Sequence, residues 1–167
     1  MLKSAFSRYL VYIVYFVGIG MVSSGIVLMP FNQVRYGTIL AIGLILFSTG
    51  SFINEVILEK KQLTTQERFK LIMLSLTLAI GIGMISGGIA HFKESPVYVT
   101  YLIPLGIVIS FLSFLFKNGY KLTKRELSVV SVLLLVVALA SHTGLSFAAA
   151  QMGFTKPGGD VFKSHGM

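Results

Sequence analysis

The chain has 167 residues, of which 54% are hydrophobic and only 12% are charged, whereas soluble domains contain about 25% charged residues. This shortage of charge excludes an ordinary soluble domain and indicates an integral membrane protein. The formal net charge of +8 does not indicate nucleic-acid binding, because the Lys and Arg residues lie between apolar runs and not on one face. Cysteine is absent, which excludes disulfides, thiolate nucleophiles and Cys-based metal sites.

Five apolar runs, taken in chain order, have the length of a transmembrane helix, about 20 residues. They cover residues 9–29, 36–56, 71–90, 97–116 and 127–150. The first run follows Lys3 and Arg8 as in a signal peptide, but it is too long for a signal-peptide core and no cleavage motif follows it. We therefore predict an all-α membrane protein, with a single transmembrane bundle over residues 1–150 and a flexible extracytoplasmic tail over residues 151–167.

The distribution of positive residues predicts the orientation of the spans, because Lys and Arg are enriched in cytoplasmic segments. Ten of them lie before the first span or in the second and fourth connections: Lys3, Arg8, Lys60, Lys61, Arg68, Lys70, Lys117, Lys121, Lys124 and Arg125. The other side has four: Arg35, Lys93, Lys156 and Lys163. We expect the N-terminus inside and the C-terminus outside.

An internal repeat relates the first two pairs of spans. Residues 18–26 read GIGMVSSGI and residues 81–89, which lie 63 positions later, read GIGMISGGI, with seven identities in nine positions. The same offset pairs Gly43 with Gly106. We predict two tandem helical hairpins, residues 9–56 and 71–116, followed by a fifth helix over residues 127–150. Each unit has an even number of spans, so the copies are parallel, which disfavours a transporter of the inverted-repeat type.

Small residues four positions apart are typical of close helix packing in membranes. Four such pairs occur: Gly20 with Ser24, Gly83 with Gly87, Gly106 with Ser110, and Ala140 with Gly144. We predict that these residues pack against other helices within the bundle. The alternatives are a seam between copies of the chain, or a thin-walled path for a small solute.

His142 is the one strongly polar ionisable residue well inside a predicted span, and such residues merit a functional hypothesis. At a rise of about 1.5 Å per residue it lies about 22 Å from the inner edge, near the height of Ser23, Ser24 and Ser86. These hydroxyls and Thr143 could satisfy a neutral imidazole through hydrogen bonds. We also predict a kink at Pro104 at this height, and we hypothesise an outer-leaflet polar pocket formed by the three serines, His142 and Thr143.

Imidazole also binds transition metals, so His91 and His142 are candidate ligands of a metal or a haem. Their heights match poorly, because His91 lies near the outer membrane surface. Copper is a further alternative through Met152, His165 and Met167 in the tail. We nevertheless expect no cofactor. Glu55 lies at the inner end of the second span beside Glu59, Lys60 and Lys61, and we expect it to reach into water.

The chain contains no phosphate-binding loop, no Ser-His-Asp set and no paired acids within the spans. An enzyme therefore ranks below the other functions. We expect a non-enzymatic accessory or scaffold subunit of a membrane complex, as a homo-oligomer or with other chains, in the bacterial cytoplasmic membrane. The alternatives are a small-solute or ion transporter or channel that uses the outer pocket, and a haem or metal protein.

Overall fold

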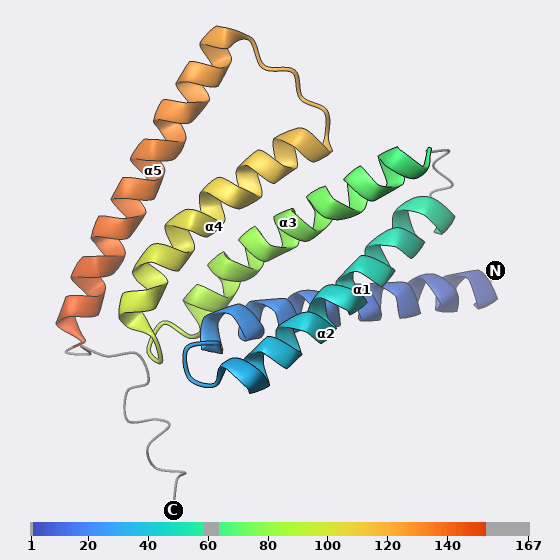
Figure 1. The fold of residues 1–167 in the computed structure, drawn as a ribbon, viewed down its shortest axis with the longest axis horizontal. Coiled ribbons are helices and arrows are strands. Elements are labelled where there is room, and N and C mark those ends of the chain that lie inside the picture. Colours follow the sequence, from blue (N-terminus) through green and yellow to red (C-terminus); the bar gives the residue numbers. More distant parts are fainter. Residues whose placement is uncertain (1, 59–63, 153–167) are drawn as a thin grey trace, which may run out of the picture.

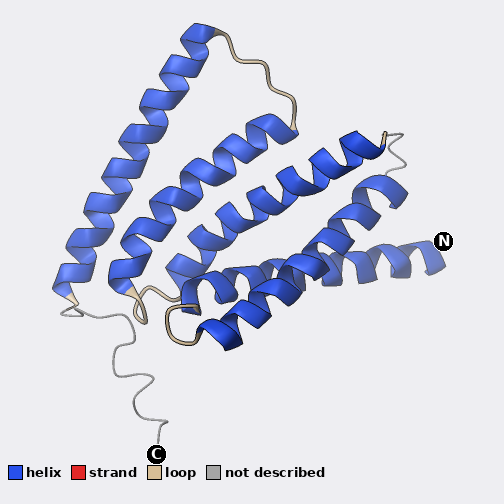
Figure 2. Cartoon of the chain, in the orientation of Figure 1, coloured by secondary structure: helices blue, strands red, loops and turns tan. Residues whose placement is uncertain are grey.

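A computed structural model describes residues 2–58 and 64–152 of the chain. These residues form helices and connecting turns, with no strand among them (Figure 2). The elements are α1 (Leu2–Leu28), α2 (Gln33–Phe52), the π-helix η1 (Ile53–Leu58), α3 (Thr65–Ala90), α4 (Pro96–Lys117) and α5 (Lys124–Gln151). Figure 1 shows α1, α3 and α5 running one way and α2 and α4 running back.

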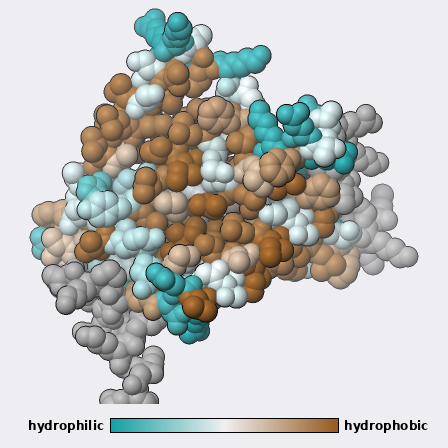
Figure 3. Space-filling view, in the orientation of Figure 1, coloured by the Kyte–Doolittle hydropathy of each residue, from teal (hydrophilic) through white to brown (hydrophobic). Residues whose placement is uncertain are grey.

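Within the described residues, five helices are long and apolar enough to cross a membrane. Apolar side chains cover the middle of the visible face, and hydrophilic ones gather toward the helix ends (Figure 3). This pattern fits a bilayer, whose apolar core is about 30 Å thick. The predictions of an all-helical fold and of five helices able to span a membrane are confirmed. The expected tail over residues 151–167 lies almost wholly outside the described residues.

A capping box begins each of two helices, α3 and α5, several residues before the predicted apolar run. The Thr64 side chain caps the N-terminus of α3 while the Glu67 side chain accepts from the Thr64 backbone, and Thr123 and Glu126 form the same arrangement at α5. Such capping boxes satisfy backbone N–H groups that have no partner in the first turn. The polar residues before each apolar run are therefore helical, and they extend both helices at the same end of the bundle (Figure 1).

The helices pack as two hairpins and one outer helix. α1 packs most extensively on α2 and α3 on α4, while α1 also contacts α3. α5 packs chiefly on α4, at the edge of the bundle (Figure 1). The buried apolar cluster lies where α1, α3 and α4 meet and contains Val27, Met84, Val99, Leu102 and Ile103.

Glycines allow very close approach inside both hairpins. A Cβ added to Gly18 would lie 2.5 Å from the backbone nitrogen of Phe47, and a Cβ added to Gly81 would lie 2.6 Å from that of Ser110. Both residues of the second pair lie 63 positions after those of the first. A Cβ added to Gly106 would likewise lie 2.7 Å from the carbonyl oxygen of Gly81. In lipid, such backbone proximity gains dispersion contacts that acyl chains do not replace.

The predicted packing residues differ in how far they are buried. Gly83, Gly87 and Gly106 are buried at helix interfaces, and Ser110 faces Gly81. Ser24 is half-buried. Gly20, Ala140 and Gly144 are exposed, and neither glycine has a described neighbour within 4 Å of an added Cβ. For those three the expected packing within the bundle was wrong, because their helix faces point away from the neighbouring helices.

Candidate functional site

His142 of α5 binds the backbone of α4 through a carbonyl that a proline has freed. The nitrogen of Pro104 has no hydrogen, so the carbonyl oxygen of Thr100, four residues earlier, has no helical donor. The His142 Nδ1 atom lies 2.9 Å from that oxygen. A buried carbonyl without a partner is costly in lipid, so this contact both satisfies α4 and attaches α5 to it.

The same contact determines the tautomer of the neutral imidazole. A carbonyl oxygen only accepts, so Nδ1 carries the proton and donates. In the neutral ring the lone pair is then on Nε2, which has no hydrogen-bond partner among residues 2–58 and 64–152. The ring also stacks at a tilt on Tyr101, with 4.8 Å between the ring centroids. Nε2 can therefore accept a hydrogen bond or bind a metal.

An apolar groove of about 310 Å³ runs between α4 and α5 beside this contact. Its lining comprises Tyr101, Pro104, Leu105, Leu135, Leu139 and His142, together with Val108 and Ala138. Such a surface has room for an acyl chain or an apolar side chain, and it offers almost nothing to an ion or a polar solute.

The five residues of the hypothesised outer pocket occupy different places. The Ser23 and Ser86 hydroxyls are 3.2 Å apart, where α1 crosses α3. His142 binds α4 instead. Thr143 donates to two carbonyls of its own helix, those of Leu139 and Ala140. Ser24 is half-buried on α1. The structure brings the two repeat-related serines together, and the described contacts do not join them to His142.

The two candidate metal ligands lie on different elements, His91 at the end of α3 and His142 within α5. The Nδ1 atom of His91, at the end of α3, lies 3.6 Å from the Oε1 atom of Glu94. Among the described residues no group of three His, Cys, Asp or Glu side chains could hold a metal ion. In the proposed copper set, Met152 is exposed, while His165 and Met167 lie outside the described residues.

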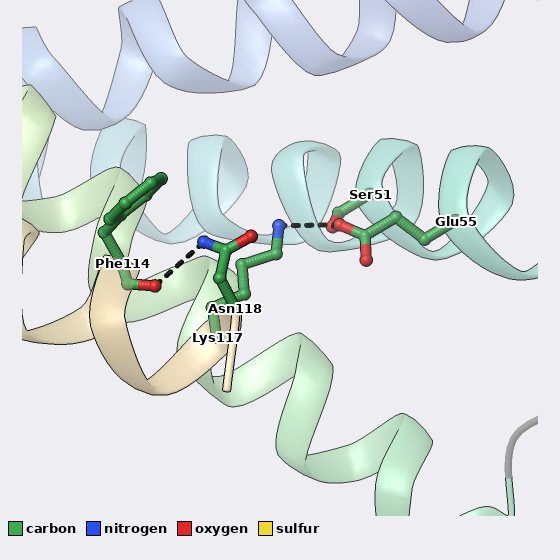
Figure 4. Close-up of polar contacts among 5 residues, drawn as sticks. All are labelled: Ser51, Glu55, Phe114, Lys117 and Asn118. Atoms are coloured by element: carbon green, nitrogen blue, oxygen red, sulfur yellow. Dashed lines mark hydrogen bonds and ion pairs between the residues drawn. The ribbon is translucent and has the colours of Figure 1, made fainter. Parts of the chain in front are cut away.

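A second polar cluster lies at the other end of α4 from the His142 contact, and the sequence did not predict it. The Lys117 Nζ atom of α4 donates to Glu55 Oε1 at 2.7 Å, and Ser51 Oγ donates to the same oxygen at 3.4 Å (Figure 4). Glu55 is only 7% exposed, so the expectation that it reaches into water was wrong. It lies in the π-helix η1, and such segments are frequent at functional sites.

Loss of the imidazole should weaken the attachment of α5. We expect His142→Ala to lower the free energy of unfolding by about 1 kcal/mol, the usual size of a hydrogen bond between membrane helices. In a Pro104→Ala background, residue 104 regains an N–H for the Thr100 carbonyl, so the same substitution should cost less. A double-mutant cycle of unfolding in detergent measures the difference. An equal cost in both backgrounds would contradict the role given to Pro104.

Comparison with known proteins gives no relative from which a function could be transferred. No protein-family model, no curated protein and no solved structure matches this chain. Two polar clusters therefore stand as the candidate sites: His142 with Thr100 on the side of the bundle, and Glu55 with Lys117 at its end.

Proposed function

We propose that the chain is a non-enzymatic accessory or scaffold subunit of a membrane complex, and that α5 is the helix that contacts the partner. The observation that carries this proposal is the packing of α5. Its most apolar 18-residue stretch contains no buried residue, whereas 44% of the corresponding stretch of α4 is buried. One hydrogen bond to the Thr100 carbonyl and the contacts with α4 hold it in place.

The exposed side of α5 has the composition of a helix interface. Ala140 and Gly144 lie one turn apart on the face opposite His142, and both are exposed. Leu133, Val136 and Phe147 extend the same face and are at least 55% exposed. Large apolar residues flanking a small-residue pair allow the close approach of a second helix.

We also propose that residues 9–56 and 71–116 arose by duplication and form the rigid part of the subunit. The matching glycine contacts of Gly18 and Gly81 support this proposal. So does the contact of Ser23 with Ser86, since equivalent residues meet where a pseudo-two-fold axis passes between two copies. With parallel hairpins that axis lies along the membrane normal.

The proposed orientation, with the N-terminus inside, predicts which connections are accessible from outside the cell. The chain has no cysteine, so single-cysteine variants give a clean readout. Lys93 and Lys121 are exposed and lie in connections at opposite ends of the bundle. We expect a membrane-impermeant maleimide to label Lys93→Cys in intact cells, and Lys121→Cys only after permeabilisation. The reverse pattern would overturn the orientation.

Site-specific photo-crosslinking tests the partner face. A photoreactive residue at Val136 should give one discrete crosslinked species in native membranes, whereas the same residue at Ile45 of α2 should give none. Both positions are strongly exposed, at 55% and 66%, so accessibility does not separate them. Equal labelling of lipid from both positions, without a protein adduct, would reject α5 as the contacting helix.

The available nitrogen of His142 favours one other candidate function, the binding of a haem or metal. Nε2 has a lone pair and no described partner, and a neutral imidazole of this kind is a common ligand. The absorption spectrum and metal content of the purified protein decide this candidate. A Soret band or a stoichiometric metal that disappears in His142→Ala would support it, and a colourless, metal-free preparation would reject it.

A further inference from the structure

A cavity of about 300 Å³ lies between the beginning of α3 and the end of α4. The α3 side contributes Lys70, Leu71 and Leu74, which share one helix face, together with Glu67. Phe116, Lys117 and the two residues after α4 form the other side. The cavity therefore combines ammonium groups with apolar walls at the end of two membrane helices, where lipid headgroups lie.

The charged groups around this cavity differ in how far they are already engaged. Lys117 is paired with Glu55, as Figure 4 shows. The Oε2 atom of Glu67 accepts from the nitrogen and the hydroxyl of Thr64, each at 2.8 Å. Lys70 is exposed and forms no ion pair with any residue in the described ranges. Lys70 is thus the cation that remains available to an anion in this cavity.

The apolar walls indicate what kind of anion fits. Leu71 and Leu74 follow Lys70 along α3 toward the middle of the membrane, and Phe116 faces the cavity from α4. A free phosphate would leave these side chains uncovered, whereas a phospholipid places acyl chains on them and its phosphate at the level of the lysines. Basic pockets between membrane helices at the cytoplasmic side are typical sites for anionic lipid headgroups.

We propose that this cavity binds one anionic phospholipid, with its phosphate held by Lys70. The acyl chains lie against Leu71, Leu74 and Phe116. The choice of the inner leaflet rests on the proposed orientation, but the site itself does not, and it requires no partner protein. Its failure is therefore distinguishable from failure of the proposed function.

Lipid binding to the purified chain in detergent tests the proposal, with phosphatidylglycerol and phosphatidylcholine as the probes. Phosphatidylglycerol should bind more tightly than phosphatidylcholine. Lys70→Gln should weaken its binding about fivefold, the effect of one basic residue at a membrane surface. Lys93→Gln, which removes an exposed lysine at the other end of the bundle, should have no effect.

A second substitution should strengthen lipid binding, an effect that misfolding of the variant would not produce. Glu67→Gln keeps a residue that completes the cap of α3 but removes a negative charge from the cavity, so phosphatidylglycerol should bind more tightly. Unfolding curves without lipid show whether each variant is intact. Equal affinity for the two lipids, or equal loss in Lys70→Gln and Lys93→Gln, would overturn the site. Displacement by glycerol 3-phosphate at millimolar concentration would overturn a lipid as the ligand.

Discussion

Gly81→Ala should be severely destabilising, although it adds only one methyl group. The new Cβ would lie 2.6 Å from the backbone nitrogen of Ser110, and a backbone atom in a packed helix has little freedom to move aside. Overpacking of this kind costs about 1–3 kcal/mol and sometimes more, and we expect about 3 kcal/mol here. Because the equivalent position in the first hairpin is equally close to Phe47, Gly18→Ala should have a similar effect.

Gly144→Ala is the matched control, since nothing described lies within 4 Å of an added Cβ there. Alanine also has the higher helix propensity, by about 1 kcal/mol, so this variant should be as stable as the original chain or slightly more so. Reversible unfolding in mixed detergent micelles gives the three free energies. If Gly81→Ala and Gly144→Ala unfolded alike, the close packing of α3 on α4 would be refuted.

Lys117→Met should be the most damaging substitution at a charged position. It removes the ammonium group that lies 2.7 Å from the carboxylate of Glu55, which is only 7% exposed. Removing one member of a buried pair costs about 3–5 kcal/mol. Since the Lys117 side chain is itself 19% exposed, we expect about 3 kcal/mol. The same unfolding measurement applies.

Two further variants separate the ion pair from a general effect of charge. Lys121→Met removes an exposed lysine close by, and it should change the free energy of unfolding by less than about 0.5 kcal/mol. Adding Glu55→Gln to Lys117→Met should recover much of the loss, because no buried charge then remains. A double variant that is less stable than Lys117→Met alone would show that the pair is not the cause.

The number of helices followed from the sequence because a bilayer requires about 20 apolar residues for each span. The predicted helix ends agree less well with the structure. The first run was placed at residues 9–29, whereas α1 is Leu2–Leu28, and the third at residues 71–90, whereas α3 is Thr65–Ala90. Hydropathy finds only the apolar part of a helix. The threonine and glutamate three residues apart at Thr64 and Thr123 were the available signal for the two later starts.

Which glycines pack was harder to predict, because a small-residue pair shows that close approach is possible but not which face meets a neighbour. Gly18 and Gly25 of α1 are both buried against α2. They lie seven positions apart, as do Gly81 and Gly88 of α3. The spacing of four positions includes Gly20 instead, which is exposed. The seven-residue spacing in both copies of the repeat was the better signal.

The contact between His142 and Thr100 could have been found by counting. Pro104 frees the carbonyl four residues before it, and the predicted height of His142 already matched that of the proline. The predicted partners were the serines at the same height, yet the Ser23 hydroxyl is engaged with Ser86. The pair of Glu55 and Lys117 joins two helices whose relative position no local pattern specifies, so only the tertiary structure reveals it.

The mass of the protein extracted with its surrounding lipid tests the central proposal most directly. A single chain has a mass of 18.2 kDa. If the chain is an accessory or scaffold subunit, native mass spectrometry of polymer-extracted membrane particles should show it in a complex with at least one further polypeptide. Replacing Gly144 with Phe on the open face of α5 should dissociate that complex while leaving the subunit folded. A single chain accompanied only by lipid, in particles from its native membrane, would contradict the proposal.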